Sequence, residues 1–120
     1  MRLSATVLES PDANALAAFY RALLGWQVRE EEPGWVMLAP PGGGAGLSFS
    51  TDPQYVRPTW PARPGAQQMM AHLDIEVDDL DESSARAVEL GATVAGFQPQ
   101  QHVRVHLDPD GHPFCLFLNT

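Results

Sequence analysis

The sequence has little of three things: cysteine, basic residues and long apolar stretches. A single cysteine, Cys115, excludes a disulfide within the chain. Seven basic residues stand against 15 acidic ones, and the formal net charge of -8 argues against nucleic acid, whose phosphates require a basic surface. No apolar stretch approaches the length of a membrane span, and no signal peptide is visible. We therefore expect a cytoplasmic protein without nucleic-acid or membrane partners.

The excess of acidic side chains also indicates a class of ligand. It favours a cationic ligand if the charge is focused in a cleft, although solubility alone accounts for it equally well. The chain of 120 residues suits one compact domain, and its hydrophobic fraction of 44% is sufficient for a core.

The first half of the chain predicts one helix among short strands. Asp12 is a good N-cap, apolar residues recur at helical spacing after it, and Gly25 ends the run. Apolar alternation and turn residues place the strands around this helix. The expected strands lie at 3–9, 26–30, 35–39 and 46–50.

The same order of elements then recurs. Asp79 caps a second helix that runs to Leu90 and ends at Gly91. An offset of 67 residues places Ala5 under His72 and Asp12 under Asp79. The turn Asp108-Pro109-Asp110-Gly111 separates the last two strands, and we expect His112 beside it to be structural. The expected strands lie at 70–77, 93–97, 103–107 and 114–118.

Between the halves, residues 51–67 hold four prolines and no regular pattern. This segment predicts a linker with Tyr55 and Trp60 as aromatic anchors. The order βαβββ, linker, βαβββ indicates an internal duplication. We predict a single domain with module one at about 1–50, the linker at 51–67 and module two at about 68–120.

Three segments resemble one known superfamily. Phe19–Trp26, His72–Asp79 and Leu107–Phe114 are similar to the vicinal oxygen chelate superfamily of glyoxalase I, extradiol dioxygenases and bleomycin-resistance proteins. The resemblance implies an α+β fold in which two tandem βαβββ modules form a cupped mixed sheet with helices on the outer face. It also implies a homodimer.

Strand alternation assigns the side chains to a helix-covered face and an open face. In the strand near 72–77, the apolar residues are expected beneath the helix and the polar ones toward the cleft. The same rule, applied to 103–107, sends the valines inward and Arg104 and His106 toward the cleft. The predicted ligand-binding residues are Glu9, Trp35, Ser48, Ser50, Trp60, His72, Asp74, Glu76, Arg104, His106, Cys115 and Phe117.

The resemblance also implies where a metal would bind. Metal-using members place two ligands in each module, and these positions fall on Ala5, Ser48 (or Ser50), His72 and Cys115. Alanine has no donor and serine is a poor ligand, whereas a catalytic site needs at least three protein donors. We therefore predict no metal and no cofactor. One alternative stays open: zinc held by His72, His106 and Cys115 on a shared face.

Two functions of different class follow. The first is a metal-independent protein of the glyoxalase/bleomycin-resistance type that binds an organic ligand, cationic or aromatic, in the cleft. The second is a lyase or isomerase that uses His72 with Glu76 or Asp74 as acid and base, with a non-standard metal site as one version. A structural or regulatory dimer without turnover is the third possibility.

Overall fold

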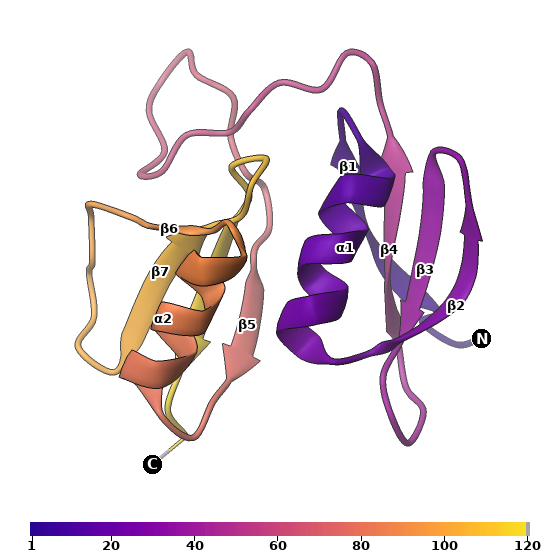
Figure 1. Ribbon diagram of the computed structural model, residues 1–120. Coiled ribbons are helices and arrows are strands. Elements are labelled where there is room, and N and C mark those ends of the chain that lie inside the picture. The colour runs from indigo at the N-terminus through magenta and orange to yellow at the C-terminus, as the bar shows by residue number, and fades with distance from the viewer. Residues whose placement is uncertain (120) are drawn as a thin grey trace. The chain divides into compact units, whose positions relative to one another are not determined.

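The computed structural model describes residues 1–119 and divides into two compact units. Unit 1 is Met1–Tyr55 and unit 2 begins at Val56. Each unit contains one helix and one four-stranded mixed sheet, in the order βαβββ (Figure 1). In the described residues, neither helix is long and apolar enough to cross a membrane.

Unit 1 is organised around helix α1 (Ala13–Leu24). Asp12 caps it by accepting a hydrogen bond from the Ala15 N–H at 3.2 Å, and Gly25 ends it in the left-handed region with φ 71°. The buried side of the helix packs on the sheet, where Tyr20 stacks on Phe49 with ring centroids 5.6 Å apart. The sheet order is β1-β4-β3-β2. Its strands are β1 (Ala5–Ser10), β2 (Gln27–Glu32), β3 (Trp35–Ala39) and β4 (Gly46–Thr51).

Unit 2 repeats this plan around helix α2 (Leu80–Leu90). The Asp79 carboxylate accepts from the Glu82 N–H at 3.0 Å and caps the helix, and Gly91 follows its last residue. The sheet order is β5-β8-β7-β6, with β5 parallel to β8 and the other pairs antiparallel. Its strands are β5 (Leu73–Glu76), β6 (Thr93–Val94), β7 (Val103–Leu107) and β8 (Pro113–Phe117).

The predicted α+β fold of two tandem βαβββ modules is confirmed, and each module has its own mixed sheet. The duplication extends to strand register, because the pair Val7–Ser48 in unit 1 corresponds to Asp74–Cys115 in unit 2. Corresponding backbone positions in the two units can therefore be compared directly.

The strand expected at 93–97 is shorter than predicted. Beyond Val94, the side-chain amide of Gln98 occupies both backbone groups of Val105: it accepts from the N–H at 2.9 Å and donates to the carbonyl at 2.9 Å. It also donates to the Ala95 carbonyl at 2.8 Å. The Ala95 N–H still donates to the Val105 carbonyl at 3.0 Å. Beyond this bond, the Gln98 side chain takes the place of further strand pairing at this edge of the sheet.

As predicted, the proline-rich segment has no helix or strand, except that Thr51 ends β4. Its part from Val56 onward belongs to unit 2. The Trp60 indole N–H donates to the Phe97 carbonyl at 3.0 Å, which confirms Trp60 as an anchor. Arg57 donates to the carbonyl of Pro109 at 3.1 Å.

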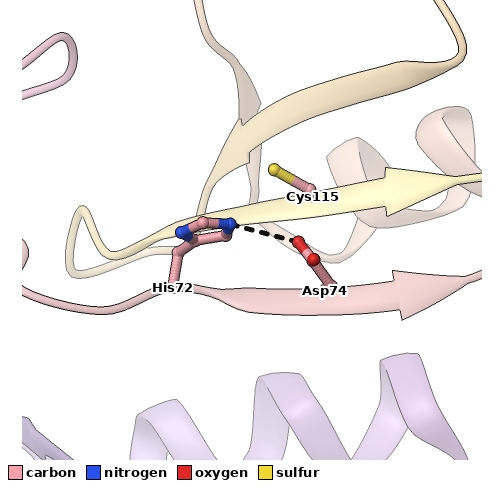
Figure 2. A group of neighbouring side chains, drawn as sticks. All are labelled: His72, Asp74 and Cys115. Atoms are coloured by element: carbon pink, nitrogen blue, oxygen red, sulfur yellow. Dashed lines mark ion pairs between the residues drawn. The ribbon is translucent and has the colours of Figure 1, made fainter.

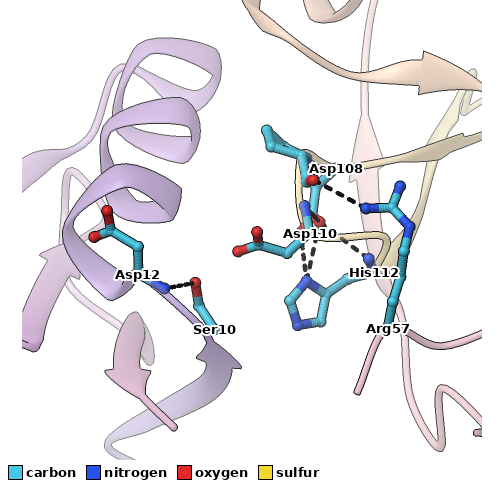
Figure 3. A network of polar contacts seen from close by, with 7 residues as sticks. Ser10, Asp12, Arg57, Asp108, Asp110 and His112 are labelled. Carbon is cyan, nitrogen blue, oxygen red and sulfur yellow. Dashed lines mark hydrogen bonds and ion pairs between the residues drawn. The ribbon is translucent and has the colours of Figure 1, made fainter. Parts of the chain in front are cut away.

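The predicted turn before β8 is present and involves His112. The Gly111 N–H donates to the Asp108 carbonyl at 2.9 Å, and His112 Nδ1 lies 2.8 Å from Asp108 Oδ2 (Figure 3). The Asp108 side chain is fully buried. Its carboxylate is satisfied by the His112 ring and by the backbone N–H groups of Asp110 and His112, which donate to Oδ1 at 2.9 and 3.0 Å. His112 is therefore structural, as expected from its position beside the turn.

Candidate functional site

The open face of unit 2, defined as the side of its sheet opposite α2, combines an acidic margin with an apolar strip. Residues directly opposite each other on paired strands point to the same face. One row across the sheet is Asp74, Cys115 and Val105. The next row is Glu76, Phe117 and Val103. In both rows the carboxylate lies on β5, where it is exposed, and the apolar side chain lies on β7.

The predicted orientation of β7 is wrong. His106 is fully buried on the helix side, where its Nε2 lies 2.8 Å from the Ser84 hydroxyl of α2. Its ring stacks on Phe114 with centroids 5.2 Å apart. Arg104 donates to Asp81 of α2 at 2.9 Å. These two predicted cleft residues therefore lie on the face opposite Cys115.

The physical reason is that both faces of β7 have packing partners. On the helix side, Ser84 and Asp81 satisfy the polar side chains of the strand. On the open face, Val105 packs in a cluster with Ala95, Cys115 and the indole of Trp60. The alternation of β7 correctly separated its side chains into an apolar and a polar set. The assumption that the apolar set faces the helix placed both sets on the wrong faces of the sheet.

A compact cluster of His72, Asp74 and Cys115 lies on the open face (Figure 2). His72 Nε2 lies 3.1 Å from Asp74 Oδ1, and one donor atom from each of the three residues lies within 4.8 Å of the others. His72 and Asp74 are exposed, whereas Cys115 is buried. His72 directly precedes β5, two residues before Asp74, and Asp74 is the strand partner of Cys115. The three side chains come together in this way at the start of the strand.

The electrostatics of this cluster disfavour a thiolate. Burial raises the pKa of the Cys115 thiol, and the Asp74 carboxylate beside it raises this pKa further through its charge and a hydrogen bond. A nucleophilic cysteine requires an electropositive neighbour that lowers its pKa. This environment therefore disfavours a nucleophilic role for Cys115.

The zinc set left open as an alternative, His72 with His106 and Cys115, is not brought together. His106 lies on the other face, and Asp74 takes its place in the cluster. The signal for Asp74 was present in the sequence, since it alternates with Leu73 and Ile75 two residues after His72.

The other predicted site residues belong to unit 1. Glu9 pairs with Ser50 and Ser50 with Trp35, so these three share the face of their sheet opposite α1. Ser48 lies on the same face and is buried. With Ala5 and Ser48 at two of the four positions, the ligand set implied by the resemblance lacks half of its donors and does not fit a resident metal.

Three open-face residues were missed by the sequence analysis. Val103 and Val105 would have been found if the apolar side chains of β7 had been assigned to the open face. Phe97 is 50% exposed and lies beside Trp60, with ring centroids 6.0 Å apart. No local pattern connects these two aromatic residues, because 37 positions separate them in the chain.

A separate groove of about 350 Å³ lies in unit 1 between α1 and strands β2 and β3. Its floor is apolar, with Val36 and Leu38, and its rim includes Arg21 and Glu31. None of the predicted site residues lines this groove. Because predicted site residues gather on the open face of unit 2 instead, we place the candidate site there.

Comparison with known proteins agrees with the fold. One solved relative is a glyoxalase/bleomycin resistance protein/dioxygenase family enzyme from Burkholderia phytofirmans PsJN, with a TM-score of 0.74, 19% identity, and 98% of each chain covered. Another is the fosfomycin resistance protein FosX from Mesorhizobium loti, with a TM-score of 0.70, 14% identity, and 98% of this chain and 91% of that chain covered. These identities support the fold alone. No curated protein matches the chain.

The family itself is established by the sequence match. Residues 5–117 match the family model described as a glyoxalase-like domain, which spans both βαβββ units. The chain therefore belongs to the glyoxalase-like domain family of the vicinal oxygen chelate superfamily.

Proposed function

We propose that the open face of unit 2 binds a small organic cation with a flat apolar body. The observation that carries this proposal is the row Glu76, Phe117 and Val103, in which a carboxylate, an aromatic ring and an aliphatic side chain lie next to one another. A flat apolar body would cover Phe117 and Val103, and the positive charge would lie at the β5 margin.

Charge and aromatic character support the same ligand class. Asp74 and Glu76 are both exposed on β5, where a cationic group can reach them. Trp60 packs at the edge of the strip and offers an aromatic face for a cation. The net charge of -8 adds a long-range attraction for cations.

The proposed binding does not depend on the metal of the superfamily, because Ala5 and Ser48 supply neither imidazole nor carboxylate. Solved relatives with drug-resistance names include the fosfomycin resistance protein and a glyoxalase/bleomycin resistance protein from Albidiferax ferrireducens T118. A small-molecule role on this scaffold is consistent with those names.

Tryptophan fluorescence tests the proposal. Titration with a panel of cationic aromatic compounds, in the presence of a chelator, is expected to quench the emission of Trp60. Trp60→Phe should remove most of the quenching, and Glu76→Gln should weaken binding. Glu89→Gln is the matched control, since it removes the same charge from the exposed surface of α2.

Two results would contradict the proposal. One is the absence of quenching across the whole panel. The other is an equal loss of affinity in Glu76→Gln and Glu89→Gln, which would show that Glu76 acts only through the net charge of the protein.

A second function is favoured by one contact. The 3.1 Å pair of His72 and Asp74 is suited to proton transfer in a lyase or isomerase reaction, with Asp74 rather than Glu76 as the partner of the histidine. Exchange of carbon-bound protons next to a carbonyl, followed by NMR in deuterium oxide over a panel of small carbonyl compounds, tests this function. We expect exchange to be lost in His72→Gln and kept in His102→Gln, and equal rates in both variants would exclude it.

A further inference from the structure

We propose that the groove of unit 1, between α1 and strands β2 and β3, binds a short zwitterion in which an apolar chain separates an ammonium group from a carboxylate. The ammonium would lie at Glu31 and the carboxylate at Arg21. The volume of about 350 Å³ falls within the roughly 300–1,000 Å³ that is typical of small-molecule sites. The groove belongs to unit 1 alone, so this site is independent of the function proposed for the open face of unit 2.

The interior of the groove is apolar because β3 lies beneath α1. Val36, Leu38 and Ala17 line it and are each at most 2% exposed. On the helix wall, Ala18 and Ala22 also line the groove, and their short side chains leave room between the helix and β2. These surfaces suit a carbon chain, so polar recognition falls to the charged side chains at the rim.

A β-bulge directs Glu31 into this groove. Val28 is paired with Leu38, and regular alternation would place Glu30 next on the same face. The register shifts between Val28 and Glu30, so Glu31 becomes the partner of Val36. Since paired residues point to the same face, Glu31 faces α1 and Glu30 faces the opposite side of the sheet.

Arg21 lies at the other end of the groove. Together with Val28 it also lines an adjoining hollow, to which Glu31 does not contribute. The strand partners of Val28 and Glu31 are Leu38 and Val36, which are two residues apart on β3. Two residues of an extended strand span about 7 Å. A short apolar floor therefore separates the positive end of the groove from the negative end.

The end of the groove beside Glu31 is closed by Asn14. The Asn14 side-chain amide donates to the Glu32 carbonyl at 3.1 Å and accepts from the Gly34 N–H at 2.8 Å. These bonds connect α1 to the turn between β2 and β3. Because the Asn14 amide is engaged in this way, Glu31 is the polar group that remains for a ligand at this end.

Both charged groups can be reached by a ligand. Within residues 1–119, neither the Arg21 guanidinium nor the Glu31 carboxylate has a hydrogen-bond or ion-pair partner. Both side chains are exposed. Arginine matches a carboxylate with two parallel hydrogen bonds, and a carboxylate accepts from an ammonium group. A zwitterion would satisfy both charges at once, whereas a simple anion or cation would satisfy one of them.

An NMR titration of the full protein with ε-aminocaproate tests the site. We expect saturable shifts in the backbone amides of Ala18, Ala22 and Val28, without shifts on the open face of unit 2. Caproate lacks the ammonium group and hexylamine lacks the carboxylate. Each should bind about two- to fivefold more weakly, as expected for the loss of one exposed ion pair.

Charge variants with matched controls identify the two recognition groups. Arg21→Gln and Glu31→Gln should each weaken ε-aminocaproate about two- to fivefold. In Glu31→Gln, caproate and ε-aminocaproate should bind alike, because the partner of the ammonium group is gone. Glu30→Gln removes the same charge from the opposite face of β2, and Arg29→Gln removes an exposed arginine that does not line the groove. Neither control should change the affinity.

Exchange of the two charges gives a stricter test. In Arg21→Glu combined with Glu31→Arg, the net charge is unchanged and the zwitterion can lie in the reverse direction. Its affinity should therefore exceed that of either single change. Circular dichroism verifies that each variant is folded.

A filled groove separates a small-molecule site from a contact between copies of the chain. Ala18→Leu places a larger side chain in the groove from an exposed helical position, where leucine is a good helix former, and should prevent binding. Sedimentation should give the same mass for this variant and the unaltered protein. A change of oligomeric state would show that a second copy occupies the groove and would overturn the zwitterion site.

Three further outcomes overturn the site: no saturable shifts with ε-aminocaproate, equal affinity for caproate or hexylamine, or an equal loss in Glu30→Gln and Glu31→Gln. Failure here is distinguishable from failure of the proposed function. Quenching of Trp60 by cationic aromatic compounds, without shifts in the groove, would leave the function of unit 2 intact and exclude the site in unit 1.

Discussion

At the residue scale, His106 shows how one buried side chain connects a strand to a helix. Its ring lies between Ser84 of α2 and Phe114 of β8, with Nδ1 3.1 Å from the Arg104 carbonyl. Burial lowers the pKa of His106 from its usual value of 6.5, and the nearby Arg104 charge lowers it further, although the backbone hydrogen bond opposes both effects. The neutral ring is therefore the form that stabilises the fold.

The lowered pKa of His106 predicts a loss of stability in mild acid. Below pH 6.5 the unfolded chain binds a proton at this histidine while the folded chain resists it, so the free energy of unfolding decreases with falling pH. The contribution is fully present above pH 6.5 and is lost as the pH falls toward the lowered folded-state pKa. Urea unfolding at several pH values between 8 and 5 measures it.

The control for this prediction is His106→Gln, which has a side-chain amide but no titrating ring. The unaltered protein should lose more stability than this variant between about pH 7 and 5, since the remaining histidines and carboxylates are common to both. Parallel pH profiles for the two proteins would contradict the assignment of this effect to His106.

At the element scale, the two helices are specified by short local signals, which is why the sequence predicted them well. Asp12 and Asp79 cap the first turns, and Gly25 and Gly91 follow the last residues, as local composition predicts. The faces of β7 were not predictable in this way. They depend on Ser84 and on the Trp60 segment, which lie far from the strand in sequence.

The cap of α2 gives a quantitative prediction. Asp79→Ala removes the acceptor for the Glu82 N–H and should lower the free energy of unfolding by about 1 kcal/mol. Asp78→Ala removes a neighbouring exposed carboxylate and is expected to cost less, which controls for charge. Urea denaturation compares the two variants. Equal losses would show that the cap bond contributes nothing beyond the charge.

At the scale of the whole molecule, the two units share one scaffold but differ in the side chains that form the candidate site. The two units share element order, strand register and helix caps, so these features were predictable from the repeat. The cluster of His72, Asp74 and Cys115 is confined to unit 2, because Ala5, Val7 and Ser48 stand at the corresponding positions of unit 1. The sequence indicated this asymmetry through His72 and placed Asp74 and Cys115 on the same face, but the 3.1 Å contact between His72 and Asp74 became evident only in the structure.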